Sequence, residues 1–119
     1  SILKGMKKVY KKRKIISVFE PHRYSRILSL KKAFSKSFIN SDIVLICPIY
    51  AAGEKKNFHF SLYNFAKLIA KNSKIQVVIV KNQIELTQYF RKNLINDEII
   101  IGMGAGSISR WMRELKLNL

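Results

Sequence analysis

The fold is decided by the stretch Asp42-Ile43-Val44-Leu45-Ile46-Cys47-Pro48-Ile49. Apolar residues follow one another here without polar alternation, which is typical of a parallel strand that is covered on both faces. Similar stretches at about 14–19, 75–80 and 98–103 predict three further strands. We therefore expect a mostly parallel sheet at the centre of the molecule.

Helical periodicity fills the segments around these strands. We predict helices at 1–12 and 25–39, and three more that begin at Ser61, Asn82 and Ser107, residue types that cap helix N-termini. The faces expected to point inward in the first two helices are Ile2, Met6, Val9 and Tyr10, and Ile27, Leu30, Phe34 and Phe38. The alternation predicts the α/β class: a mostly parallel sheet with right-handed crossovers, helices on both faces and a Rossmann-like arrangement.

Length and composition describe one globular domain, 1–119. The sequence is 48% hydrophobic and 25% charged, which is ordinary for a folded chain. No apolar run approaches the ~20 residues of a membrane span. The lone Cys47 lies in an apolar stretch, so we interpret it as a packed thiol rather than a nucleophile. A single cysteine forms no internal disulfide, which fits a reducing cytoplasm.

The net charge of +16, taken alone, favours a nucleic-acid partner. Lysine, isoleucine and asparagine are all abundant, however, and this joint excess indicates a codon bias toward A and T that requires no partner. The cations cluster in one place, at Lys7, Lys8, Lys11, Lys12, Arg13 and Lys14. We favour a solvated helix face there over a phosphate-binding surface, and keep a basic nucleic-acid-binding α/β module as an alternative.

Loops that leave the carboxyl ends of parallel strands meet at one edge of the sheet, where α/β proteins build their sites. The first such loop contains His22, Arg23 and Arg26, an imidazole and two guanidiniums that suit a carboxylate or a phosphate. The two arginines are three residues apart at a helix start, so we expect both to lean over one ligand. Pairing with surface carboxylates is the alternative, but the chain has only seven acidic residues.

The second loop reads Tyr50-Ala51-Ala52-Gly53-Glu54. Its small residues allow a close approach of the backbone, and Gly53 permits a turn that other residues avoid. Glu54 is expected either to orient a cation or a hydroxyl group, or to be solvated.

The third loop, Gly102-Met103-Gly104-Ala105-Gly106-Ser107, resembles the dinucleotide-binding fingerprint but departs from it. Ser107 stands where the third glycine belongs, and the loop follows the last strand, so no acidic residue about 20 positions on can reach a ribose. Glycines at the start of a helix still present backbone N–H groups to an anion. We expect a second substrate group here rather than NAD.

Together, Phe19–Arg26, Tyr50–Glu54 and Gly104–Ile108 resemble, in order and spacing, the C-terminal domain of the Mur ligases. Within that family the likeness is to the branch that joins L-alanine to UDP-N-acetylmuramate. The chain departs from the family's usual pattern at Glu20, Ile27 and Pro48, where Gln, Thr and an acidic residue are common.

The resemblance implies an ATP-dependent, amide-bond-forming ligase of peptidoglycan precursor synthesis, in the bacterial cytoplasm, that works through an acyl phosphate. ATP and Mg²⁺ would be held mainly by a central domain, and the UDP-sugar by an N-terminal one, both outside this chain. The chain begins at Ser1 without a methionine and would lack the first segment of the C-terminal domain, so we expect it to be inactive alone.

For this chain the resemblance implies substrate- or nucleotide-binding residues, but no catalytic residue and no metal ligand. They are His22, Arg23, Arg26, Tyr50, Gly53, Glu54, Gly104, Gly106 and Ser107. The expected partners are UDP-N-acetylmuramate, L-alanine, ATP and the enzyme's own central domain, with no nucleic acid and no membrane. A sister ligase that recycles a peptide onto the same sugar is the other alternative, although its equivalent of His22–Tyr24 differs.

Overall fold

All four strands lie parallel in one sheet, in the order β3-β2-β1-β4. A computed structural model describes residues 2–57, 59–94, 97–104 and 106–119. In chain order the elements are α1 (Ile2–Val9), β1 (Ile15–Phe19), α2 (Tyr24–Ser35), β2 (Ile43–Ile46), α3 (Leu62–Ser73), β3 (Gln76–Ile79), α4 (Gln83–Asn93), β4 (Ile99–Met103) and α5 (Ile108–Asn118). The predicted α/β class and parallel sheet are confirmed.

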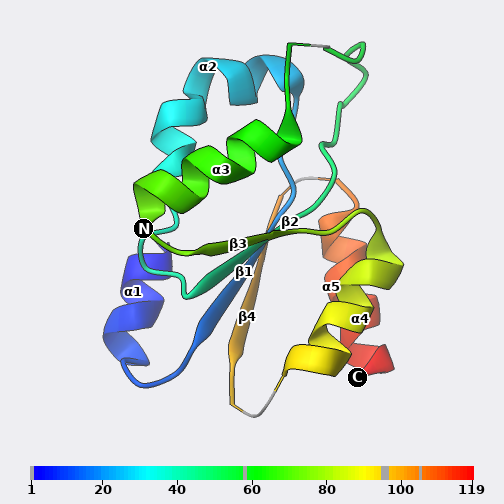
Figure 1. The fold of residues 1–119 in the computed structure, drawn as a ribbon. Coiled ribbons are helices and arrows are strands. Elements are labelled where there is room, and N and C mark those ends of the chain that lie inside the picture. The colour runs from blue at the N-terminus through cyan, green and yellow to red at the C-terminus, as the bar shows by residue number, and fades with distance from the viewer. Residues whose placement is uncertain (1, 58, 95–96, 105) are drawn as a thin grey trace.

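Helices cover both faces of the sheet: α1, α2 and α3 lie on one side, and α4 and α5 on the other (Figure 1). Val44 and Ile46 of β2 belong to the hydrophobic core under the first group, whereas Leu45 and Cys47 belong to the core under the second. Successive side chains of a strand point to opposite faces, so a strand covered on both sides is apolar at every position. This is why the stretch 43–47 shows no alternation.

The inward faces of the first two helices differ from those predicted. Leu3 is the buried residue of α1, whereas Ile2 and Val9 are each 72% exposed. This helix has only eight residues and packs through Leu3 and Met6, one turn apart. In the second helical segment Leu30 is 43% exposed. The core contacts there come from Ile27, from the partly buried Phe34 and from Phe38, which lies just beyond the helix end.

Two of the three predicted helix caps are confirmed. Ser61 accepts a hydrogen bond from the N–H of Asn64 at 3.1 Å, and Asn82 accepts one from the N–H of Glu85 at 2.9 Å. Ser107 occupies the N-cap position of α5 as predicted, but it has helical backbone angles and its side chain makes no cap hydrogen bond. The side chain of Glu20, from another loop, accepts the hydrogen bonds at that helix start.

The predicted helix 25–39 is shorter at its C-terminus and ends at Ser35. Two buried serines hold that end: the Ser73 hydroxyl at the end of α3 donates to the Ser35 carbonyl at 2.6 Å. Asn72 also donates to the Ser35 hydroxyl, at 2.8 Å. These side-chain contacts connect the C-terminal ends of α2 and α3, and the chain leaves the helix through tighter turns.

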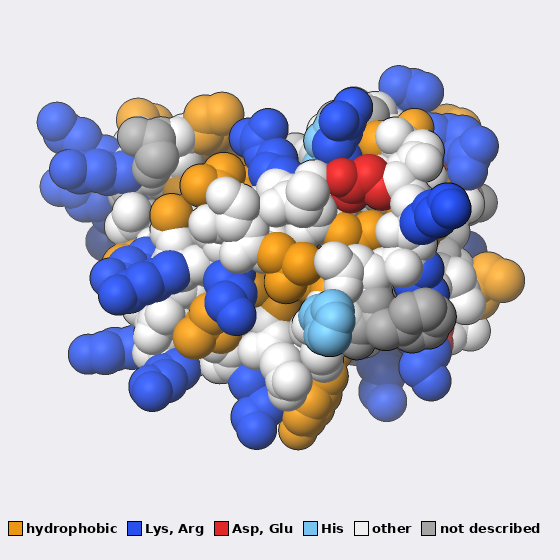
Figure 2. Space-filling model, turned by 90° about the horizontal axis from the view of Figure 1, so that it is seen from above, with side chains coloured by type: hydrophobic (Ala, Val, Ile, Leu, Met, Phe, Trp, Pro, Cys, Tyr) orange, Lys and Arg blue, Asp and Glu red, His pale blue; other side chains and the backbone are white. Residues whose placement is uncertain are grey.

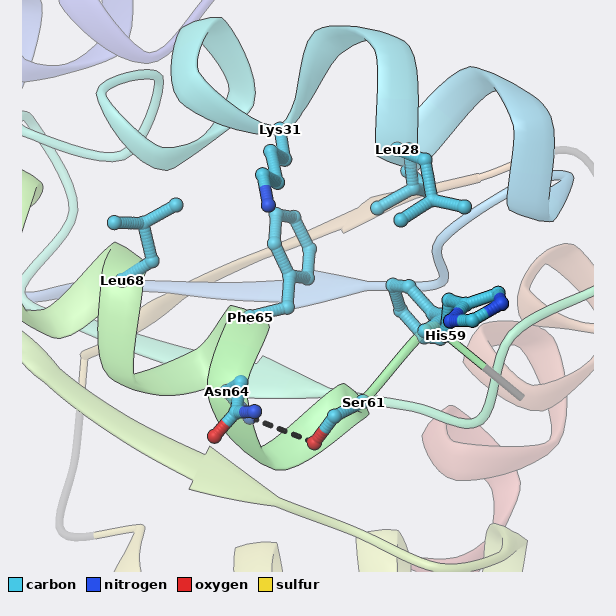
Figure 3. Close-up of a pocket in the computed structure, with 9 residues that line it drawn as sticks. Leu28, Lys31, His59, Ser61, Asn64, Phe65 and Leu68 are labelled. Atoms are coloured by element: carbon cyan, nitrogen blue, oxygen red, sulfur yellow. Dashed lines mark hydrogen bonds between the residues drawn. The ribbon is translucent and has the colours of Figure 1, made fainter. Parts of the chain in front are cut away.

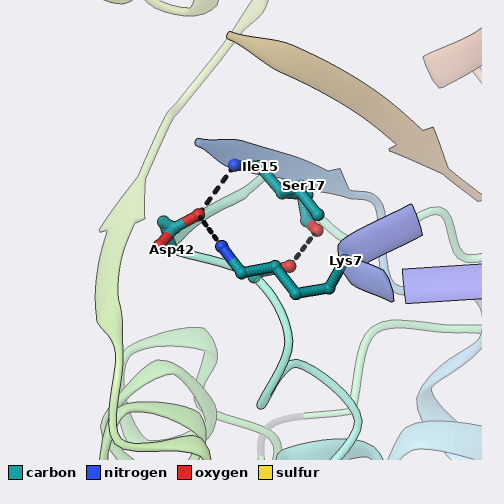
Figure 4. Close-up of polar contacts among 5 residues, drawn as sticks. Lys7, Ile15, Ser17 and Asp42 are labelled. Atoms are coloured by element: carbon teal, nitrogen blue, oxygen red, sulfur yellow. Dashed lines mark hydrogen bonds and ion pairs between the residues drawn. The ribbon is translucent and has the colours of Figure 1, made fainter. Parts of the chain in front are cut away.

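Asp42 fastens α1 to the amino edge of the sheet (Figure 4). Its Oδ2 accepts a hydrogen bond from the N–H of Ile15 at 2.7 Å and lies 3.5 Å from Nζ of Lys7. The hydroxyls of Ser17 and Ser41 are hydrogen-bonded in the interior beside it. The side chain of Asp42 therefore connects helix α1 to the start of β1.

Among the described residues, no helix is long and apolar enough to cross a membrane.

Candidate functional site

The loops after β1 and β2 continue to pair beyond the strand ends. The N–H of Tyr50 donates to the carbonyl of Pro21, and the N–H of Arg23 donates to the carbonyl of Tyr50, both at 2.8 Å. On the other side of β1, the N–H of Glu20 donates to the carbonyl of Met103 at 2.9 Å. Backbone hydrogen bonds thus bring the three predicted loops together at the carboxyl edge. Seen from that edge, Lys and Arg side chains surround the face and acidic side chains are few (Figure 2).

Tyr50 is the residue on which the loops converge. Its ring stacks on the imidazole of His22, with centroids 5.5 Å apart and planes 9° apart. A Cβ at Gly106 would lie 2.6 Å from ring atoms of Tyr50, so only glycine permits this approach. Tyr50 therefore contacts His22 of the first loop and Gly106 of the third.

Glu20 caps helix α5 from the first loop. Its side chain is buried, and its carboxylate accepts hydrogen bonds from the N–H groups of Gly106 at 2.8 Å and Ser107 at 3.2 Å. A negative charge is favourable at a helix N-terminus, and hydrogen bonds to an ionised acceptor are strong. In this structure the anion at the start of α5 is a carboxylate of the chain itself.

Glu54 performs the same function for helix α2. The N-cap residue Arg23 has no side-chain cap, and Glu54 instead accepts from the hydroxyl of Ser25 and from its N–H, the latter at 3.2 Å. The hydrogen bond from the Ser25 hydroxyl, followed by those from the N–H groups of Ser25 and Tyr24 and by the charge of Arg23, lowers the pKa of Glu54. Of the two expected roles, orienting a hydroxyl group is the one observed.

The structure separates the two arginines. Arg26 lines a surface pocket of about 230 Å³ together with His22, Glu20 and Gly104, and its guanidinium lies 5.9 Å from the ring centroid of Phe34. Arg23 does not line this pocket. The spacing argument required both residues to be helical, but α2 begins after Arg23, whose backbone angles are φ 64° and ψ 130°. Only Arg26 therefore faces the pocket with His22.

The remaining glycines of the predicted site have two different roles. Gly53 has φ +87° with open space around it, so the backbone conformation alone explains why glycine is favoured at this position. Gly104 has φ +155°, and a Cβ there would lie 2.8 Å from Cβ of Glu20 and from Cγ2 of Ile108. Conformation and space both require glycine at that position.

Sequence reasoning missed Glu20 and Ser25 as parts of this site. Both lie inside the first loop motif, and the signal was available for Glu20, which stands where the related pattern has Gln. Sequence reasoning also missed a pocket of about 240 Å³ between α2 and α3, where Lys31 of α2 points toward Phe65 of α3 (Figure 3). That pocket contains none of the predicted site residues.

Cys47 is the one thiol of the chain, and it is buried. Burial, reinforced by the charge of Glu20, raises the pKa of the Cys47 thiol to about 12, which confirms the interpretation of a packed thiol. Within the described ranges no group of three His, Cys, Asp or Glu side chains is arranged to hold a metal ion. At this edge the guanidinium of Arg26 and the imidazole of His22 are groups that can bind an anion.

Comparison with known proteins identifies relatives of this chain. No protein-family model matches the chain. It is 46% identical over 114 residues to a UDP-N-acetylmuramate–L-alanine ligase of Pelagibacter ubique, an alignment that covers 96% of this chain and 25% of the relative. The ligase of the same name from a Hydrogenobaculum species is 37% identical over 114 residues, covering 96% and 24%. The chain thus spans about a quarter of the length of these relatives.

A solved structure has the same fold. The crystal structure of a murein peptide ligase from Psychrobacter arcticus superposes with a TM-score of 0.71, covering 98% of this chain and 24% of that one. The sequence identity is 13%, so this similarity concerns the fold alone.

Proposed function

Because the chain belongs to the Mur ligase family, we propose that it is the C-terminal part of an ATP-dependent ligase that joins L-alanine to UDP-N-acetylmuramate. The observation that carries the proposal is the 46% identity along nearly the whole chain. In agreement with it, three loops that are distant in the sequence meet at one edge of the sheet. The product would be a peptidoglycan precursor, made in the bacterial cytoplasm. The alanine amine would form the new amide bond with the muramoyl carboxylate.

In this proposal the chain contributes one wall of the active site. Arg26 and His22 line a pocket of about 230 Å³, beside the stack of His22 on Tyr50. A guanidinium binds a carboxylate through two parallel hydrogen bonds, which fixes its orientation as well as its position. Holding the carboxylate of alanine in this way would aim its amine at the second reactant, an entropic contribution to rate. The wall requires no covalent nucleophile.

The residues of this chain are poorly suited to bind ATP or Mg²⁺. The described residues form no metal-binding group, and two N–H groups at the start of α5 already donate to Glu20. We therefore assign ATP and Mg²⁺ mainly to other parts of the full-length protein. ATP, when bound, would supply the activation of the carboxylate.

The proposal is tested by Arg26→Ala in the full-length enzyme. Loss of one charge-assisted contact costs about 1.5–3 kcal/mol, so KM for alanine should rise, or kcat fall, by about ten-fold or more. Arg26→Lys should recover only part of this effect, because an ammonium lacks the planar fork. Lys31→Ala is the matched control, since it removes a cation of α2 from the other pocket and should leave the kinetics within about two-fold. Near-normal kinetics in Arg26→Ala would refute the assignment.

Two further measurements define the activity. The 119-residue chain should form no ligation product by itself, and measurable product would contradict the proposed division of the site. The full-length enzyme should use free L-alanine in preference to an alanine-containing peptide. Preference for the peptide would favour the sister ligase, a distinction that the shared fold leaves open.

A further inference from the structure

A side chain of the protein itself lies at the switch point of the sheet. In the strand order β3-β2-β1-β4, strands β2 and β3 are added on one side of β1 and β4 on the other. The switch point therefore lies between β1 and β4, and open α/β sheets bind ligands at such a point. Glu20 directly follows β1, and its side chain reaches the start of α5, which follows β4. It remains only 4% exposed there. A buried carboxylate therefore occupies the position that a ligand takes in related architectures.

The third loop is fitted around this carboxylate. Both oxygens of Glu20 are used, Oε1 by the N–H of Gly106 and Oε2 by the N–H of Ser107. The backbone of Gly104 passes so close that a Cβ would meet Cβ of Glu20 at 2.8 Å. Hydrogen bonding and packing on both sides thus hold Glu20 in place.

An external anion would have to displace this internal one. A tethered group acts at a high effective concentration, which a free phosphate or carboxylate must exceed. The fixed negative charge also repels a second anion at short range. Glu20 also lines the pocket that contains Arg26 and His22, and there the guanidinium of Arg26 supplies a positive charge that an anion can meet.

We propose that Glu20 is a positioning residue that keeps the N-terminus of α5 closed to phosphate and carboxylate ligands. It thereby leaves Arg26 and His22 as the anion-binding groups of this edge. The first statement is independent of the ligase reaction, and only the second rests on the proposed function.

The test measures binding of inorganic phosphate by the ¹⁵N-labelled chain, read from the amide signals of Gly106 and Ser107. Glu20→Ala should bring saturable shifts of both signals, with a midpoint at least ten-fold lower than in the wild type. Glu20→Gln should give a smaller gain, because its amide oxygen still accepts one of the two hydrogen bonds. Glu54→Ala is the matched control: it removes the carboxylate that caps α2 and should leave these two signals as in the wild type.

The outcomes decide the proposal in either direction. Equal phosphate midpoints in the wild type and in a folded Glu20→Ala would overturn it. If the Ala variant does not fold, Glu20→Gln decides, because Gln has nearly the same volume. Failure of both to fold would show that the carboxylate is only structural, which also overturns the proposal.

A second readout connects Glu20 to the reaction. In the full-length enzyme, inorganic phosphate should inhibit Glu20→Ala at least ten-fold more strongly than the wild type, and Glu54→Ala no more strongly than the wild type. Equal inhibition of the wild type and Glu20→Ala would remove the link to the anion-binding groups. If the enzyme proves to have a different activity, the proposed function fails, while the amide titration still decides the role of Glu20.

Discussion

Replacing Gly104 by alanine perturbs the point at which the third loop passes over Glu20. At φ +155° a residue with a side chain is strained by about 1–3 kcal/mol. The new methyl group would also lie 2.8 Å from Cβ of Glu20 and from Cγ2 of Ile108, and such overpacking costs about 1–3 kcal/mol. Neither neighbour yields cheaply, since Glu20 is held by two hydrogen bonds and Ile108 is a core residue. We expect a loss of about 4 kcal/mol, a large part of the 5–15 kcal/mol typical of a domain.

Two other glycines separate these contributions. Gly53 has φ +87° but open space around it, so Gly53→Ala should show only the conformational cost of about 1–2 kcal/mol. Gly5 lies within α1 and also has open space, so Gly5→Ala should stabilise the chain by about 0.5–1 kcal/mol.

Urea unfolding, followed by the fluorescence of Trp111, measures all three variants. With a slope of about 1.5 kcal/mol per molar, the midpoint should fall by about 2–3 M for Gly104→Ala and by about 1 M for Gly53→Ala. A Gly104→Ala midpoint equal to that of Gly53→Ala would refute the reasoning, because it would mean that the crowding against Glu20 contributes nothing.

Asp42→Ala should lower the free energy of unfolding by about 1–3 kcal/mol, because the N–H of Ile15 loses its acceptor, whereas Lys7→Ala should cost under about 1 kcal/mol in this partly exposed pair. Equal losses in urea unfolding would contradict the importance of the backbone contact. The pKa of Glu54 is lower in the folded chain, so its stabilising contribution is complete above about pH 4.3 and is lost as pH falls through the folded value. The stability difference between wild type and Glu54→Gln should therefore shrink on acidification, and a constant difference would argue against this cause. Burial raises the pKa of the Cys47 thiol to about 12, so iodoacetamide at about pH 8 should label the chain only after unfolding. Rapid labelling of the native chain would show that the thiol is accessible.

Two glutamates organise the candidate site of a strongly basic chain. Glu20 and Glu54 each cap a helix that begins at the carboxyl edge, and each comes from a loop other than the one that leads into that helix. The net charge of +16 therefore says little about this edge, where two of the seven acidic residues have defined structural partners. A substitution that removes either carboxylate therefore changes both the local charge and the contact that holds one loop against another.

The sequence by itself determined the α/β class, the parallel strands and two helix caps. These features depend on local periodicity and on side chains that bond within one turn, as the unbroken apolar run 43–47 and the caps Ser61 and Asn82 illustrate. The sequence also placed His22, Tyr50 and Gly106 in loops of one edge, since parallel strands bring such loops together.

Only the tertiary structure decided which loops touch. Alternation of helices and strands does not set the strand order, and it is the order β3-β2-β1-β4 that puts the loops after β1 and β4 side by side. Glu20 consequently meets Gly106, a residue 86 positions away, and closes the helix start that the glycine pattern had offered to a ligand. Arg23 and Arg26 are separated as well, because helix α2 begins between them and the N–H of Arg23 donates to the carbonyl of Tyr50 in another loop. Periodicity is a local property, whereas capping from another loop depends on how the whole sheet is assembled.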